Sequence, residues 1–212
     1  MTWSPAVRIV SARHTPAAAF ERIADREEAA ELLQIIAAGR PARFDPADVT
    51  VGDGAGWIVA AFLRGGAARF NDETFGAFYA AREEATAVME TQFHYARFLR
   101  DAREGYVLLG ARVLLADVDA RPVDIRARSD ELSEIYDPEP AHYSAAQRWA
   151  AEQRREGADG IVYDSVRRSG GECVAIFRPR LITSCRVGDQ LAYEWGGEAF
   201  VATYTLSRRE LE

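Results

Sequence analysis

The segment Asp159-Gly-Ile-Val-Tyr-Asp-Ser165-Val-Arg167-Arg-Ser-Gly-Gly-Glu-Cys173-Val-Ala-Ile-Phe-Arg-Pro179 decides the fold class of this chain. Two short apolar runs, 160–165 and 172–177, flank a polar turn that contains two glycines. Such runs are typical of buried strands joined by a short connection, and Pro179 closes the second strand. Ser165 stands at the end of the first strand, where a polar side chain either caps the turn or enters a site.

Helices and further strands surround this pair along the chain. Apolar spacing predicts helices over 16–38 in two pieces, 57–63, 82–103 and 142–156. Strands are expected at 7–10 and at 106–118, the latter as one long strand or a pair. A loop is expected at 40–56, two extended pieces around a polar turn at 69–81, and a terminal hairpin over 190–195 and 199–206. The strands are short and do not alternate regularly with helices. The sequence therefore predicts an α+β fold and argues against a doubly wound sheet.

The composition sets the class of protein and excludes several kinds of chemistry. The chain has 212 residues, 48% of them hydrophobic, with 33 acidic and 26 basic side chains and a net charge of −7. That length and composition suit one domain with its own core. The acidic balance argues against nucleic acid or an anionic membrane as the main partner. Every basic residue is an arginine, so no lysine is available for Schiff-base chemistry.

No targeting or metal-binding pattern stands out. No apolar run approaches the roughly 18 residues that a membrane-spanning helix needs. The first residues lack the basic start and apolar block of a secretory signal, so a cytoplasmic location is expected. Cys173 and Cys185 have no partner at metal-ligand spacing, and we interpret both as small buried hydrophobic residues. No metal site is expected.

The predicted helix over 82–103 has a polar stripe beside its apolar one. The apolar line runs through Ala85, Val88, Met89, Phe93, Ala96 and Leu99, and Tyr95 and Phe98 widen it. The polar residues Glu83, Glu90, His94 and Arg97 share another arc. A helix packed on more than one side would bring Glu90 and His94 to a cleft. The alternative is an ordinary solvated stripe of charged residues.

A second candidate segment is Gly65-Gly-Ala-Ala-Arg69-Phe-Asn71. Glycines before a single arginine allow the backbone and the guanidinium to approach a phosphate closely. The alternative is a turn followed by a surface arginine. The segment has neither the Walker nor the Rossmann spacing of glycines, which argues against a kinase or a dehydrogenase. Ser165 lacks the flanking glycines of a hydrolase nucleophile.

Taken in order, these segments resemble the RES-domain family, which is named for recurring Arg, Glu and Ser residues. The matching pieces are Val7-Arg8-Ile9, Arg69-Phe-Asn71, Gly76-Ala-Phe-Tyr79, Thr86-Ala-Val-Met-Glu90-Thr-Gln-Phe-His94 and the segment 159–179. The resemblance covers nearly the whole chain. It therefore implies a single RES domain over residues 1–212, with a helical and loop insertion at about 12–56.

The resemblance also implies a fold and a site. Family members resemble ADP-ribosyltransferases, with a mixed core of two small sheets flanked by helices around a cleft that holds NAD as the substrate. By that likeness the catalytic residues would be Glu90, Arg69, Tyr79 and Ser165. The residues that contact NAD would be Arg8, Arg69, Asn71 and Tyr79. No metal would take part.

The biological role implied by the resemblance is that of a toxin. Family members that have been studied degrade NAD or transfer its ADP-ribose, and an antitoxin of the Xre helix-turn-helix type holds each in check. The acceptor of the ADP-ribose, whether water, phosphate or a protein, stays open, as does a homodimer. Two alternatives remain: a catalytically silent module that binds NAD or a partner, and a hydrolase of another nucleotide sugar.

Two positions depart from the family pattern. Ala68 precedes the candidate Arg69 where relatives often have Gly or Ser, and Asp164 stands where Pro usually precedes the serine. Neither departure removes a candidate catalytic group, but both would alter the geometry of their loops.

Overall fold

One mixed sheet of eight strands forms the centre of the molecule in the computed structural model, which describes residues 1–14, 25–36 and 43–207. The strands lie in the order β4-β5-β6-β2-β1-β3-β7-β8. Neighbouring strands run antiparallel except β4 and β5, which are parallel. The bounds are β1 (Thr2–Ser11), β2 (Phe78–Ala81), β3 (Tyr106–Asp119), β4 (Val123–Asp124), β5 (Gly160–Asp164), β6 (Glu172–Ile176), β7 (Ile182–Gly196) and β8 (Phe200–Leu206).

Four α-helices accompany the sheet in the described residues. They are α1 (Arg26–Ile36), α2 (Ala55–Arg64), α3 (Glu84–Asp101) and α4 (Ser144–Arg155), and short 3-10 helices cover Pro46–Asp48, Pro140–His142 and Pro179–Leu181. None of the helices in this part of the chain is long and apolar enough to cross a membrane.

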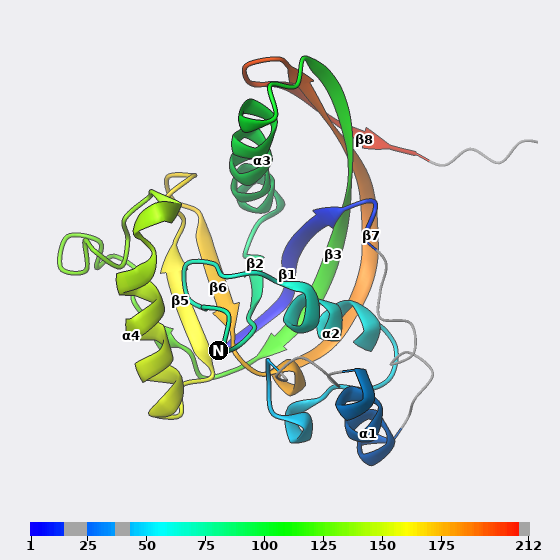
Figure 1. Ribbon diagram of the computed structural model, residues 1–212, viewed down its shortest axis with the longest axis vertical. Coiled ribbons are helices and arrows are strands. Elements are labelled where there is room, and N and C mark those ends of the chain that lie inside the picture. The colour runs from blue at the N-terminus through cyan, green and yellow to red at the C-terminus, as the bar shows by residue number, and fades with distance from the viewer. Residues whose placement is uncertain (15–24, 37–42, 208–212) are drawn as a thin grey trace, which may run out of the picture.

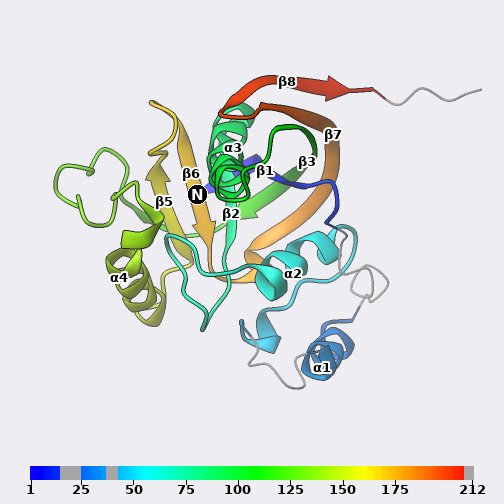
Figure 2. The same cartoon turned by 45° about the horizontal axis from the view of Figure 1, so that its top comes forward.

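The two faces of the sheet carry separate cores. Apolar residues of α1 and α2 pack on one face, among them Ala29, Ile58 and Phe62. The other face is covered by α3 and α4, through residues such as Ala87 and Ala146. Figure 1 shows α3 between the β5–β6 side and the long, curved β3–β7 side of the sheet, and Figure 2 shows the same helix nearly end-on. The sheet therefore wraps around α3.

The α+β class is confirmed, but the expectation of two small sheets is wrong, because all eight strands belong to one sheet. The half of the sheet that contains β4, β5, β6 and β2 is joined to the half that contains β1, β3, β7 and β8 by few residue pairs. β1 pairs with β3 along most of its length, whereas it pairs with β2 only at Val7 and Ala81. One pair of residues decides between one sheet and two, and hydrophobic periodicity cannot resolve a single pair.

Several strands are longer or shorter than the sequence predicts. β1 and β7 extend well beyond the expected 7–10 and 190–195, and the region 106–118 is one long strand. In the region 69–81 only β2 is a strand, while Ala68 and Asn71 form an isolated bridge. Within the expected helical region 16–38, α1 occupies Arg26–Ile36, and residues 15–24 and 37–42 lie outside the described part.

The inward face predicted for α3 is partly wrong. Its buried residues are Thr86, Ala87, Ala96 and Leu99. Met89 is 44% exposed and Phe98 is 67% exposed. Because the sheet contacts α3 from more than one direction, small side chains occupy the closest approaches, and an apolar stripe does not reveal which of its members are covered.

Candidate active site

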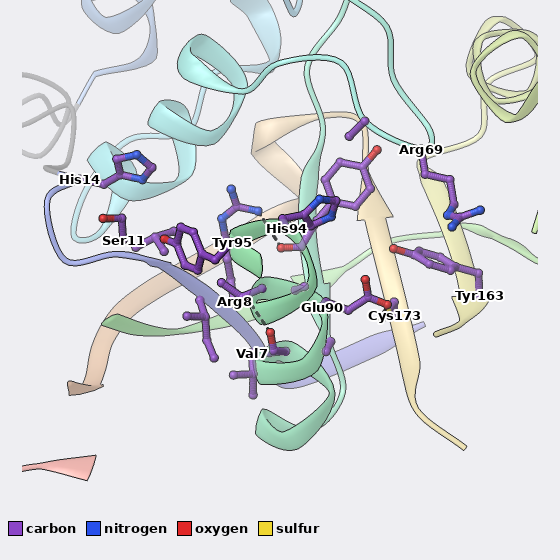
Figure 3. Close-up of a pocket in the computed structure, with 18 of the residues that line it drawn as sticks. Val7, Arg8, Ser11, His14, Arg69, Glu90, His94, Tyr95, Tyr163 and Cys173 are labelled. Carbon is purple, nitrogen blue, oxygen red and sulfur yellow. Dashed lines mark hydrogen bonds between the residues drawn. The ribbon is translucent and has the colours of Figure 1, made fainter. Parts of the chain in front are cut away.

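A cavity of about 350 Å³ lies between α3 and the part of the sheet where β1 and β2 meet. β1, β2, α3, β5 and β6 all contribute to its wall, as does the segment before β2. Polar side chains gather around it, as Figure 3 shows. They include Arg8, Arg69, Tyr79, Glu90, His94 and Tyr163. Side chains far apart in the sequence therefore meet at one concave site, which is the usual form of a ligand pocket.

Arg8 fills the gap where β1 and β2 diverge. If the register of the pair Val7–Ala81 continued, Arg8 would face Ala80 and Ile9 would face Tyr79. Instead, Nη1 of Arg8 donates a hydrogen bond of 2.8 Å to the backbone carbonyl of Tyr79. The guanidinium lies 5.0 Å from the centroid of the Phe78 ring. Burial lowers the pKa of Arg8. A side chain here takes the place of a ladder bond and brings a positive charge to the cavity wall.

Glu90 reaches the cavity from the second turn of α3. The hydroxyl of Ser165 donates a hydrogen bond of 2.6 Å to its Oε1, and Sγ of Cys173 lies 3.9 Å from the same oxygen. Ser165, in the connection between β5 and β6, and Cys173, in β6, thereby both lie against α3. Burial first, and then the negative charge of Glu90, raise the pKa of the Cys173 thiol. This cysteine is therefore protonated beside the carboxylate.

The hydroxyl of Ser165 is fully engaged. Its oxygen accepts hydrogen bonds from the backbone N–H groups of Arg167 and Arg168, both at 3.1 Å. A hydroxyl has one proton and two lone pairs, so the two incoming bonds direct that proton to Glu90. Ser165 itself is fixed by its own N–H, which donates to the carbonyl of Gly171 at 2.8 Å. The arrangement holds the Glu90 carboxylate in one orientation.

Arg69 is a buried cation held by neutral groups. Its Nη1 donates to the carbonyls of Ile135 at 2.9 Å and Asp137 at 2.7 Å, and its Nη2 donates to the hydroxyl of Tyr143 at 3.2 Å. The guanidinium also lies over the Tyr143 ring, 4.4 Å from the centroid. These bonds use three of the five N–H groups of an arginine. The charge is therefore fixed at the cavity wall, and two N–H groups remain for a ligand.

Tyr79 and Asn71 lock each other in place. The Tyr79 hydroxyl accepts from the backbone N–H of Phe70 at 2.9 Å and donates to Oδ1 of Asn71 at 2.8 Å. The Asn71 amide nitrogen lies within 3.2 Å of the carbonyls of Gly66, Asp72 and Phe75. Desolvation by burial raises the pKa of Tyr79 well above its ordinary value. The ring of Tyr79 is thus held rigidly in the cavity wall, in its neutral form.

His94 lies one helical turn after Glu90 and also lines the cavity. Desolvation lowers its pKa, and the positive charges of Arg167, Arg97 and Arg69 lower it further. Because the ordinary pKa of histidine is about 6.5, this imidazole is neutral near pH 7. The positive charges that act on it come from three separate segments, so the surroundings of this side of the cavity are cationic.

The structure brings most of the predicted site residues together. The predicted residues that line the cavity are Arg8, Arg69, Tyr79 and Glu90. Ser165 lies next to the cavity and donates a hydrogen bond to Glu90. Asn71 is placed differently, behind Tyr79 and outside the cavity lining, with its side chain fully used inside the protein. Glu90 does face the cleft, in agreement with the interpretation of the polar stripe on α3.

Other lining residues were missed by the sequence analysis. Tyr143 and Tyr163 were seen only as parts of a helix and a strand, and Cys173 only as a buried hydrophobic residue. Cys173 is indeed buried, but it also touches Glu90. The alternation in β5 and β6 was a usable signal. Tyr163 and Cys173 pair across these strands and share one face, so identifying the site side of one would have identified the other.

The two departures from the family pattern are accommodated by local contacts. Ala68 uses its backbone, donating to the carbonyl of Asn71 at 2.8 Å and accepting from Gln147 at 2.9 Å. Asp164 accepts a bond of 2.6 Å from the N–H of Ala127, a residue with a φ of 57°. Both residues therefore support loops beside the site.

Among the residues that the structure describes, no group of three or more His, Cys, Asp or Glu side chains is arranged to hold a metal ion. The free cysteines Cys173 and Cys185 are both buried.

Comparison with known proteins identifies the family. The model of the RES domain matches residues 51–196, which is more than half of the chain, so this protein belongs to the RES-domain family. An uncharacterised protein of Sinorhizobium fredii, y4oC, is 24% identical over 210 residues, which covers 93% of this chain and 85% of that protein. A chain in the crystal structure of the M. tuberculosis MbcT–MbcA toxin–antitoxin complex aligns with a TM-score of 0.48 at 12% identity, covering 98% of this chain and 86% of that one.

Proposed function

We propose that this protein cleaves the bond between nicotinamide and ribose in NAD, passing the ADP-ribose to water, phosphate or a protein. Membership of the RES-domain family supports this assignment. The observation that carries it is the joint presence, on one cavity wall, of an oriented carboxylate, Glu90, and a buried guanidinium, Arg69, that forms no ion pair with any described residue. NAD has a pyrophosphate and a ribose that develops positive charge on cleavage, and the two side chains suit these two parts.

Glu90 is the residue that stabilises the transition state. Loss of nicotinamide leaves positive charge on the ribose ring, and a carboxylate fixed beside that ring lowers the barrier because it need not reorganise during the reaction. The contacts of Ser165 and Cys173 are both made to Oε1. Oε2 is therefore the oxygen available to a ribose hydroxyl or to the ring.

The remaining residues bind and orient the dinucleotide. Arg69 pairs with the pyrophosphate through its two remaining N–H groups, because the fork of a guanidinium matches phosphate oxygens. Arg8 adds a second positive charge to the cavity wall. The ring of Tyr79, which Asn71 holds in place, packs against nicotinamide or ribose.

No general acid is needed in this reaction. The nicotinamide group of NAD is cationic before the bond breaks and leaves as a neutral molecule, so the electron pair of the bond needs no proton. This chemistry is consistent with a cavity in which Glu90 is the single carboxylate among the described residues of the wall. His94, which is neutral near pH 7, adds no positive charge beside the ribose.

The direct test is to mix the purified protein with NAD and measure free nicotinamide. Wild-type protein should release nicotinamide, and Glu90→Gln should lower kcat by about 100-fold or more, the usual scale for removing an oriented electrostatic group. Glu84→Gln is the matched control, because Glu84 is an exposed acid at the start of the same helix. Binding of NAD without any release would contradict the proposal and favour a silent binding module.

The proposed biological role is that of a toxin restrained by an antitoxin of the Xre helix-turn-helix type. Expression of the wild-type protein alone should lower cellular NAD and stop growth, and Glu90→Gln should relieve both effects. Co-expression of the protein encoded by the adjacent reading frame should restore growth if that protein is the antitoxin. Normal growth of cells that contain folded, active protein would reject the toxin role.

A further inference from the structure

Two arginines from different segments share one phenol oxygen at the edge of the cavity. The Tyr143 hydroxyl accepts a hydrogen bond of 3.2 Å from Nη2 of Arg69 and another of 3.2 Å from Nη2 of Arg167. Arg167 follows β5, and its guanidinium carbon lies 3.3 Å from the centroid of the Phe93 ring on α3. Its Nη2 also donates to the carbonyl of Pro138. Two like charges are thus held close together by neutral partners.

The acidic side chains of Asp137 and Glu139, on either side of Pro138, form ion pairs with residues other than these two arginines. Asp137 pairs with His142 at 3.0 Å, and Glu139 pairs with Arg97 at 2.7 Å. Within the described parts of the chain, no ion pair involves Arg69 or Arg167. By contrast Arg168, the next residue along, pairs with Glu83 at 2.9 Å. Two close guanidinium groups that form no ion pair repel each other, and a bound anion would relieve that repulsion.

The pair also lies at the site. Arg69 and Tyr143 both line the cavity, and so does His94, whose pKa is lowered by both arginines. The bonds of Arg167 to Pro138 and Tyr143 are made by Nη2. Its Nε and Nη1 protons therefore remain, together with two N–H groups of Arg69, to surround an anion.

We propose that Arg167 and Arg69 together bind one phosphate group at the edge of this cavity, with Tyr143 holding the two guanidinium groups in register. The proposal rests on the proposed function, because a reaction on NAD brings phosphate chemistry to the site. Two sources carry that chemistry: the pyrophosphate of the dinucleotide and a free phosphate ion. Arg167 is in this view a binding residue for the reaction, in addition to the residues assigned above.

Calorimetry with two probes, ADP-ribose and inorganic phosphate, tests the assignment on the full chain. Arg167→Gln should weaken the binding of at least one probe by about tenfold or more, which is the scale expected for one charge-assisted phosphate contact. Arg168→Gln is the matched control and should leave both affinities within about twofold, because its exposed ion pair contributes little. Arg167→Lys keeps the charge without the fork and should lose affinity to a smaller extent.

The two sources give different results. If the pyrophosphate binds to Arg69 and Arg167, Arg167→Gln weakens the binding of ADP-ribose, and phosphate competes with ADP-ribose for the wild-type protein. If a free phosphate binds to the two arginines, the wild-type protein binds phosphate and ADP-ribose at the same time, and Arg167→Gln weakens the binding of phosphate alone. Unchanged affinities for both probes in Arg167→Gln, or no binding of either by wild type, would overturn the proposal.

Nicotinamide release, measured in parallel, separates this proposal from the proposed function. A wild-type protein that binds ADP-ribose through Arg167 but releases no nicotinamide would contradict the reaction and leave the phosphate assignment in place. Thermal unfolding of each variant checks its fold. If Arg167→Gln does not fold, the comparison of Arg167→Lys with wild type decides, and equal affinities for both probes would then overturn the assignment.

Discussion

Ser165 donates a hydrogen bond of 2.6 Å to Glu90, a residue 75 positions earlier in the chain. The serine oxygen receives two backbone N–H groups in return. This relationship joins the β5–β6 turn to α3 and makes the orientation of the carboxylate depend on a strand connection. It gives Ser165 a positioning role in the proposed reaction.

The first prediction concerns that hydrogen bond. Ser165→Ala should lower kcat for nicotinamide release by about 10- to 100-fold with little change in KM, because the carboxylate loses its fixed orientation. Adding Ser165→Ala to Glu90→Gln should cause little further loss, since the serine acts through the glutamate. Ser184→Ala removes an equally short bond, to Asp117, and should leave kcat unchanged. Additive losses in the double variant would contradict the positioning role.

The second prediction concerns Gly171, whose carbonyl holds the Ser165 backbone. A Cβ at this position would lie 2.7 Å from Oγ1 and 2.8 Å from Cγ2 of Thr86, a fully buried residue of α3. Gly171→Ala should therefore separate the turn from α3, lower the free energy of unfolding by about 1–3 kcal/mol and reduce activity. Urea denaturation measures the first effect. Gly105→Ala, where a Cβ meets no atom within 4 Å, should be close to neutral.

The third prediction concerns the pair formed by Tyr79 and Asn71. Tyr79→Phe leaves the N–H of Phe70 and Oδ1 of Asn71 without their partner, and both residues are buried. An unsatisfied buried polar group costs about 1–3 kcal/mol, so the unfolding midpoint in urea should fall clearly. Tyr106→Phe, on an exposed tyrosine, serves as the control and should not change the midpoint. A stable Tyr79→Phe protein would show that the lock is unimportant.

The fourth prediction concerns pH. The pKa of His94 is lowered in the folded protein from its ordinary value of 6.5, so the unfolded chain binds this proton more readily. The free energy of unfolding should therefore decrease as pH falls below about 6.5, and His94→Gln should reduce that decrease. Thermal unfolding between pH 7.5 and about 5 measures both curves, and coincident slopes would contradict the effect of His94.

Binding of an anion should reverse this shift. A phosphate held by Arg69 and Arg167 would offset part of the positive charge that acts on His94, so ADP-ribose should raise the pKa of His94. Titration of His94 by NMR, with and without ADP-ribose, measures this change.

The sequence predicted most of the elements because their signals are local. The glycine turn between the two apolar runs at 160–165 and 172–177 indicates β5 and β6, and the spacing of apolar residues indicates α3 and α4. The single sheet could not be predicted, since it depends on one pair, Val7 with Ala81. The exposure of Met89 and Phe98 was also missed, because it depends on where the curved sheet contacts α3.

The candidate site divides in the same way. The family resemblance pointed to Arg8, Arg69, Tyr79 and Glu90, which the structure places on one cavity wall. The contacts that hold them were not predictable. Arg69 is fixed by the backbone carbonyl groups of Ile135 and Asp137. Every residue has such a carbonyl, so the residue types at these positions do not indicate the contact. Tyr143 matters through its position between two arginines, which only the assembled fold reveals.

The narrow join between β1 and β2 has a consequence for any occupant of the cavity. Arg8 and Ser11 belong to one half of the sheet, whereas Tyr79 and Cys173 belong to the other, and all four border the same space. A molecule that contacts both halves therefore links β1 and β2, the two neighbouring strands that share a single residue pair. Its binding energy strengthens the scaffold where the backbone contributes least, so recognition and structural cohesion are coupled at one place.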